Sequence, residues 1–180
     1  MSEPVDDRAL PRGVASPPAG PVEVGFDGAC EDRSGRKVAA YGYTLRGAGF
    51  QHDDFGLAVP PGHERATNNV AEYVGVICAL EWLVRHGYTG EVHIRGDSQL
   101  VQRQFTGEYQ VRAEHLRPYH DRLMQLVASF RAVRFEWVPR EQNSRADELS
   151  KRGIELGVPR KARGGRAPNE PSSDAGGNAP

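Results

Sequence analysis

The sequence predicts an α/β fold in which a mixed sheet carries helices on its faces. Three segments with strand character follow one another near the start of the chain, and helical and strand-like segments alternate after them. The 180 residues are also enough for one domain with a tail at each end. We therefore expect one domain over residues 21–157, with disordered tails at residues 1–20 and 158–180, where Pro and Gly accumulate.

The first three segments are expected to be strands. Apolar and polar residues alternate over residues 22–27, which is the period of a strand with one buried face. Two more strands fit residues 37–46 and 50–59, and the Gly47-Ala48-Gly49 sequence between them is typical of a hairpin turn.

The rest of the domain is expected to alternate between helix and strand. A long helix is predicted at about residues 70–85, ending at His86-Gly87. Its apolar residues fall on two sides, so we expect it to be buried between the sheet and another helix. The further elements are a strand at 91–95, a short helix from Ser98, an amphipathic helix at about 113–130, a strand at 133–138 and a final helix from about Ser144.

The charge of the chain is nearly balanced, with 23 Lys and Arg residues against 24 Asp and Glu. No overall basic field therefore indicates nucleic acid, and any such binding must use local patches or phosphates bridged by metal ions. A local excess of Lys and Arg lies at residues 160–166. It is interpreted either as part of a solvated tail or as a salt-sensitive anchor for phosphate.

Cysteine and histidine do not follow a disulfide or zinc-binding pattern. Cys30 and Cys78 are far apart in the sequence, and the six His residues are scattered. No segment resembles a signal peptide or the ~20 apolar residues of a membrane span. We expect a monomeric cytoplasmic protein with reduced cysteines and no membrane partner.

Four acidic residues stand in short motifs near the predicted ends of strands and helices: Asp27, Glu72, Asp97 and Asp147. Each has an ordinary structural alternative. An Asp-Gly pair often marks a turn, and an acid at the cap or in the first turn of a helix is stabilised by backbone amides. Clustered carboxylates repel one another and are costly to bury, so a site that gathers all four favours a pair of divalent cations and phosphate chemistry.

Together the motifs resemble type 1 ribonuclease H, the family that cuts the RNA strand of RNA–DNA hybrids. The resemblance covers about residues 22–156. It rests on Asp27-Gly28, on Thr67-Asn68-Asn69 before Glu72, on Asp97-Ser98-Gln99, and on residues 137–143 running into Ala146-Asp147. It implies an RNase H-like fold, with a five-stranded mixed sheet whose first three strands are antiparallel.

The resemblance also implies roles for individual residues. The four acids would bind two Mg²⁺ or Mn²⁺ ions, which suit carboxylate oxygens and can activate water and stabilise the leaving 3′ oxygen. The expected products carry 5′-phosphate and 3′-hydroxyl ends. Asn68, Asn69 and Gln99 resemble residues that contact the hybrid, including its 2′-hydroxyl groups. Their structural alternative is to cap the neighbouring helices.

Two features depart from many bacterial members of the family. Residues 138–143 contain no His, which resembles the short-loop variant, so Arg140 or Glu141 is a candidate for an auxiliary role there. Either residue is equally explained as an ordinary surface residue. Residues 110–117 also lack the dense basic cluster with which many members grip the hybrid. Substrate affinity is therefore expected to be modest.

Two alternative functions are considered. The first is a non-catalytic module that binds RNA–DNA hybrids with the same fold, and the presence of all four acids argues against it. The second is a related nuclease that acts on DNA or structured RNA. The Thr67-Asn68-Asn69 and Asp97-Ser98-Gln99 motifs argue against that one, because they match the branch that cuts hybrids.

Overall fold

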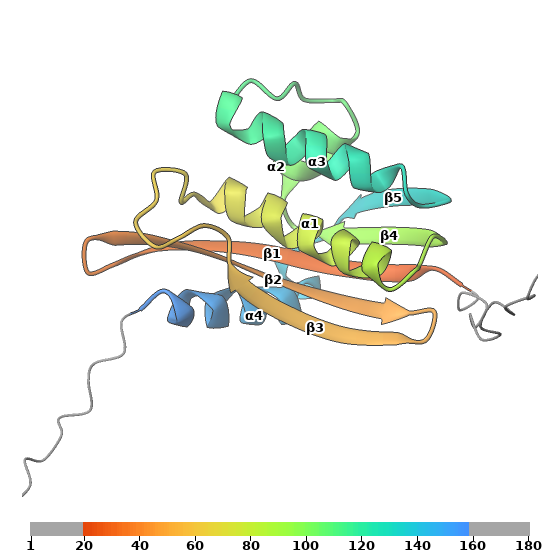
Figure 1. Cartoon of the computed structure of the whole chain (residues 1–180), viewed down its shortest axis with the longest axis horizontal. Coiled ribbons are helices and arrows are strands. Elements are labelled where there is room, and N and C mark those ends of the chain that lie inside the picture. Colours follow the sequence, from red (N-terminus) through yellow and green to blue (C-terminus); the bar gives the residue numbers. More distant parts are fainter. Residues whose placement is uncertain (1–19, 159–180) are drawn as a thin grey trace, which may run out of the picture.

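Five strands form one mixed sheet in the computed structural model, which describes residues 20–158 (Figure 1). The strands are β1 (Val22–Arg33), β2 (Arg36–Gly47), β3 (Phe50–Leu57), β4 (Glu91–Gly96) and β5 (Ala132–Trp137). Their order across the sheet is β3-β2-β1-β4-β5. The first three are antiparallel, and β4 runs parallel to β1 and β5. The predicted fold class is thus confirmed, whereas the predicted tails lie outside the described residues except for Gly20 and Val158.

Helices cover both faces of this sheet. On one face lie α1 (Asn68–Arg85), α2 (Gln99–Phe105) and α3 (Arg117–Val127), and on the other lies α4 (Ser144–Leu156) (Figure 1). The main core fills the space between the sheet and the first three helices, and it includes Phe26, Tyr73 and Leu80. Within residues 20–158, no helix combines the length and the apolar composition needed to cross a membrane.

Strand β1 is longer than its alternation predicted. It continues through residues 28–33, and the turn that follows lies at Ser34 and Gly35, both with positive φ. The interpretation of Asp27-Gly28 as a turn, and of Asp27 as the end of an element, is therefore wrong. Asp27 lies within the strand, paired with Gly42 of β2. Helices cover both faces of the sheet here, so small residues replace the alternating pattern.

Two helices differ in detail from the expected ranges. Helix α1 begins at Asn68 because the side chain of Thr67 accepts a hydrogen bond from the amide of Val70, at 3.2 Å. The sequence placed Glu72 in the first turn of this helix. In the structure Glu72 lies beyond that turn. The amphipathic segment expected at about residues 113–130 forms a 3₁₀ turn (Glu114–Leu116) followed by α3, which has a proline in its first turn.

Candidate active site

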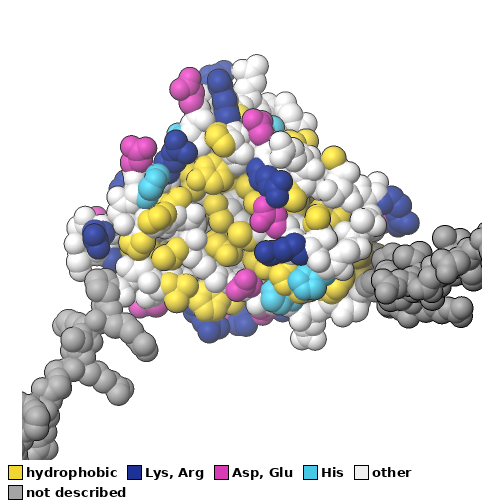
Figure 2. Space-filling view, viewed as in Figure 1, with side chains coloured by type: hydrophobic (Ala, Val, Ile, Leu, Met, Phe, Trp, Pro, Cys, Tyr) yellow, Lys and Arg dark blue, Asp and Glu magenta, His cyan; other side chains and the backbone are white. Residues whose placement is uncertain are grey.

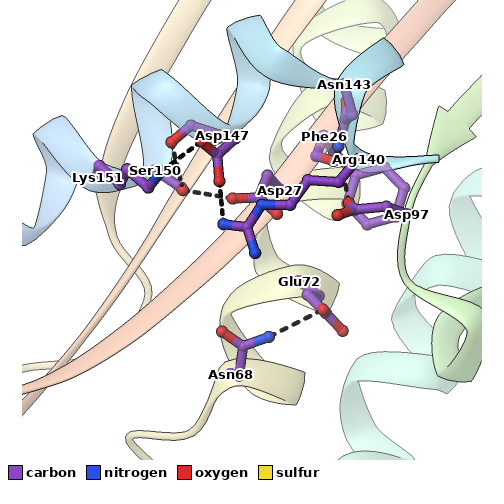
Figure 3. A network of polar contacts seen from close by, with 10 residues as sticks. All are labelled: Phe26, Asp27, Asn68, Glu72, Asp97, Arg140, Asn143, Asp147, Ser150 and Lys151. Carbon is purple, nitrogen blue, oxygen red and sulfur yellow. Dashed lines mark hydrogen bonds and ion pairs between the residues drawn. The ribbon is translucent and has the colours of Figure 1, made fainter. Parts of the chain in front are cut away.

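The four acidic residues of the sequence motifs line one small cavity of about 260 Å³. Asp27 comes from the middle of β1, and Glu72 comes from α1, which packs on one face of the sheet. Asp97 follows the end of β4, and Asp147 lies in the first turn of α4. Figure 3 shows their side chains converging from these four separate elements. The cavity is therefore assembled only when the sheet and its helices have packed together.

Two glycines allow the helices to approach this cavity closely. A Cβ atom at Gly28 would overlap the backbone nitrogen of Glu72 and lie 2.7 Å from the carbonyl carbon of Ala71. A Cβ at Gly42 would lie 2.5 Å from the backbone nitrogen of Ser150. Without a side chain at either position, α1 rests directly on β1 and α4 rests directly on β2. Glu72 and Asp147 are thereby brought next to Asp27.

Asp27 and Glu72 are the two acids whose pKa is raised. Burial raises the pKa of Asp27 to about 6, although a hydrogen bond from Ser150 at 2.5 Å opposes the shift. Burial likewise raises the pKa of Glu72 to about 7, and the charge of Asp27 adds to the effect. Glu72 accepts hydrogen bonds from Ser98 at 2.5 Å and from Asn68 at 2.9 Å. Both carboxyl groups therefore change charge near neutral pH.

The other two acids are held by different partners. Partial burial tends to raise the pKa of Asp147, but hydrogen bonds from Lys151 and Arg140 outweigh it and hold the pKa below its usual range. The Lys151 ammonium lies 2.5 Å from Asp147 Oδ2. Asp97 accepts a hydrogen bond from the Asn143 amide at 3.0 Å, and Asn143 also donates to the carbonyl of Phe26. The cavity is thus lined by two cationic side chains, by the four acids of the motifs and by a fifth acid, Glu31.

The remaining residues that the sequence suggested are distributed unevenly around the cavity. Asn68 and Arg140 line it, whereas Asn69 lines a neighbouring groove. Gln99 and Glu141 are exposed and line neither space. The helix-capping alternative for Asn68, Asn69 and Gln99 is wrong, because the capping side chains are Thr67 and Ser98.

Four polar residues around the acids were not singled out by the sequence reasoning: Ser98, Asn143, Ser150 and Lys151. Spacing offered a signal for the last two. Ser150 and Lys151 stand three and four residues after Asp147, positions that share one face of a helix. Ser98 and Asn143 stand within motifs that carried the resemblance, but no role was assigned to either, and the Asn143 amide reaches Phe26 across the chain.

The chemistry of the cavity suits divalent cations. Carboxylate oxygens are the ligands that Mg²⁺ and Mn²⁺ prefer, and the raised pKa of Asp27 and Glu72 reflects burial among other acids. Across residues 20–158, no three His, Cys, Asp or Glu side chains converge tightly enough to hold an ion by themselves. Mg²⁺ keeps several waters and takes only one or two carboxylates. Pairs of these acids can therefore bind a divalent metal ion once the two cationic side chains beside Asp147 move away from it.

The raised pKa values predict how the stability of the metal-free protein depends on pH. A carboxyl group with a raised pKa binds a proton more tightly in the folded state, so its stabilising effect is present at low pH and is lost as the pH rises through the folded value. We expect the free energy of unfolding to fall by about 2–3 kcal/mol between about pH 5.5 and about pH 8. Asp147 has a lowered pKa, so it changes the free energy of unfolding only at lower pH.

Thermal denaturation in EDTA across this pH range would test the expectation. Glu72→Gln removes the group with the larger shift, so the variant should show a much flatter dependence than the wild type. Exposed Glu64→Gln, outside the cavity, should leave the slope unchanged. A wild-type protein whose stability rises with pH over this range would contradict the described burial of Asp27 and Glu72.

Comparison with known proteins identifies the family. A family model described as reverse transcriptase-like matches residues 25–153. Ribonuclease HI of Halobacterium salinarum is 36% identical over 138 residues, which is 76% of this chain and 65% of that protein. The chain belongs to the ribonuclease H family. A bifunctional protein of Mycobacterium tuberculosis is 42% identical over 86 residues. That match covers 48% of this chain and only 23% of the mycobacterial protein.

Solved ribonuclease H structures match the fold over most of the described residues. The RNase H1 of Halobacterium salinarum superposes with a TM-score of 0.65 at 33% identity, covering 76% of this chain and 99% of that one. The N-terminal RNase H domain of the mycobacterial protein gives a TM-score of 0.66 at 30% identity, covering 76% and 95%. LC11-RNase H1, solved in complex with an RNA/DNA hybrid, gives 0.64 at 30% identity, covering 75% and 97%. The resemblance to type 1 ribonuclease H is thereby confirmed.

Proposed function

We propose that this chain is an endoribonuclease that hydrolyses the RNA strand of RNA–DNA hybrids and leaves 5′-phosphate and 3′-hydroxyl ends. The observation that carries the proposal is the meeting of four carboxylates, from four separate elements, around one cavity in a ribonuclease H fold. A relative of the same fold has been solved with an RNA/DNA hybrid, which supports the choice of substrate.

Ribonucleases H generally depend on divalent metal ions. In this chain, two Mg²⁺ or Mn²⁺ ions would be held by Asp27, Glu72, Asp97 and Asp147. When bound, such ions supply Lewis-acid stabilisation of a phosphate and help to generate the attacking hydroxide. The protein contributes by orienting the ligands. Ser98 and Asn68 hold Glu72, and Asn143 holds Asp97.

Arg140 is the auxiliary residue that the geometry favours. Its side chain is 63% exposed, lines the cavity and bonds to Asp147. A planar guanidinium binds phosphate as readily as carboxylate, so Arg140 can exchange Asp147 for a phosphate of the substrate when Asp147 takes up its metal ligand role. Glu141 is exposed and does not line the cavity, and we assign it no role in the reaction.

The hybrid is proposed to lie across the cavity and the groove beside it. This groove measures about 700 Å³ and is lined by Asn69, Gln104, Tyr109 and Arg112, among others. Asn68 and Asn69 are consecutive, and one lines the cavity while the other lines the groove. The first turn of α1 would therefore lie between the two strands of the hybrid, and the RNA strand would lie at the four acidic residues. Gln99, exposed at the start of α2, is proposed to contact the same substrate.

Charge does not provide a strong general attraction for nucleic acid. Figure 2 shows acidic and basic side chains intermixed around apolar ones on the face in view. Binding is therefore expected to be modest and to depend on local contacts and on metal ions. We further propose that the protein is monomeric and cytoplasmic.

Cleavage assays on end-labelled substrates test this function. Wild type should cut the RNA strand of an RNA–DNA hybrid with Mg²⁺ or Mn²⁺, and EDTA or Asp97→Asn should abolish the cuts. Duplex RNA and duplex DNA should remain intact. Binding of the hybrid without cleavage under either metal would favour the non-catalytic module, and cleavage of duplex DNA or duplex RNA in preference to hybrid would favour the related nuclease.

A further inference from the structure

Ser150 is a fully buried polar residue beside the candidate active site. Its exposed fraction is 0%, and its hydroxyl oxygen lies 2.5 Å from Asp27 Oδ2 and 2.9 Å from the backbone carbonyl oxygen of Asp147 (Figure 3). Ser150 does not line the cavity itself. It therefore contacts an acid of the site from behind, where neither metal ion nor substrate would reach it.

The hydroxyl group has a single proton and two acceptors within reach. A hydrogen bond to an ionised carboxylate is roughly twice as strong as one to a neutral carbonyl, so the proton favours Asp27 whenever that acid is charged. Within residues 20–158, Ser150 is the one side chain that donates a hydrogen bond to the Asp27 carboxyl. The bond engages Oδ2 and thereby leaves Oδ1 without a competing protein donor.

Two of the other three acids are held by two partners each. Glu72 has donors on both oxygens, from Ser98 and Asn68. Asp147 has a cation on each oxygen, from Arg140 and Lys151. Asp97, like Asp27, accepts from one side chain, the Asn143 amide. The orientation of Asp27 therefore depends on one hydroxyl group, whereas Glu72 and Asp147 are each held by two partners.

Ser150 also connects two of the acids mechanically. It stands one helical turn after Asp147 on α4, while Asp27 belongs to β1. The helix approaches the sheet closely at Gly42, where a Cβ would lie 2.5 Å from the backbone nitrogen of Ser150. Gly42 is in turn the register partner of Asp27. The hydroxyl bond therefore spans the contact that sets the spacing between Asp27 and Asp147.

We propose that Ser150 is a positioning residue, whose hydroxyl fixes the orientation of the Asp27 carboxylate and its spacing from Asp147 so that the two carboxyl groups are already placed for divalent ions when the cations beside Asp147 move away. The inference rests on the proposed function, because it assigns these acids to the metal ions. A group that orients a ligand from behind typically changes metal affinity or activity by about 10–100-fold when it is removed. A serine that only filled space would change neither.

Ser150→Ala tests the proposal in the full chain. Alanine keeps the helix and removes only the hydroxyl, so the variant is expected to fold. We expect Mn²⁺ affinity, measured by calorimetry without substrate, to fall by about 10-fold, and kcat on the hybrid to fall similarly, with KM for the hybrid unchanged. Ser150→Thr retains the hydroxyl and should recover most of both losses. Ser144→Ala, an exposed serine of the same helix, should behave as wild type in both assays.

The outcomes separate this proposal from the function on which it rests. Unchanged Mn²⁺ affinity and unchanged kcat in Ser150→Ala would overturn the positioning role, as would a loss of stability without a loss of Mn²⁺ affinity. Failure of Ser150→Thr to recover Mn²⁺ affinity, in a folded variant, would also overturn it. A wild type that cuts no hybrid would refute the proposed function, yet a Mn²⁺ affinity that falls in Ser150→Ala and recovers in Ser150→Thr would still support the positioning role.

Discussion

Asp27→Asn is expected to abolish cleavage of the hybrid while raising the melting temperature of the metal-free protein. Asp27 is 6% exposed, and burial raises its pKa to about 6, so at neutral pH the folded protein carries a charge in an unfavourable place. Asparagine keeps the shape and an oxygen that can accept the Ser150 hydrogen bond, but it has no charge for a metal ion. We expect kcat to fall by at least about 10³-fold.

Initial rates with Mg²⁺ and thermal denaturation in EDTA provide the two measurements. Exposed Glu23→Gln, on the same strand, is the matched control and should change neither value appreciably. Loss of a cooperative melt in Asp27→Asn would show that the acid is structural. Cleavage at near wild-type rates would remove Asp27 from the metal-binding set.

Gly28→Ala is expected to cost about 3 kcal/mol of stability and to disrupt the site at the same time. The added methyl group would overlap the backbone of α1 at Glu72 and Ala71. Backbone atoms in a buried helix cannot turn aside as a side chain can, so the whole first half of α1 must move away from β1. Glu72 would move with it, and cleavage should fall together with the melting temperature.

Gly56→Ala is the matched control for this effect. It also adds a methyl group to a strand of the same sheet, but the nearest atoms belong to the ring of Tyr41, with its hydroxyl oxygen 2.9 Å away. The ring can shift, so a change below about 1 kcal/mol is expected. Chemical denaturation of both variants gives the comparison. Equal stability of Gly28→Ala and the wild type would mean that α1 does not rest on β1 as described.

Much of the fold could be predicted because its signals are local. Helix α2 begins after Ser98 as expected, since an N-cap side chain acts on amides only three residues away. Strand β4 and helix α4 likewise occupy nearly the expected ranges. The second half of β1 was missed for a physical reason. Gly28, Ala29 and Cys30 lie at a sheet position covered by helices on both faces, so the strand loses the alternation by which a sequence shows one.

For the site, the sequence by itself determined which acids are present, their order and their placement in motifs typical of one family. Only the tertiary structure decided what holds each acid. The Ser150 hydroxyl reaches Asp27 across 123 positions, and the Asn143 amide reaches Asp97 across 46. Such partners depend on how closely α4 packs against the sheet, which Gly42 permits, and no local periodicity encodes that distance. Burial, which raises the pKa of Asp27 and Glu72, is likewise a property of the packed layers.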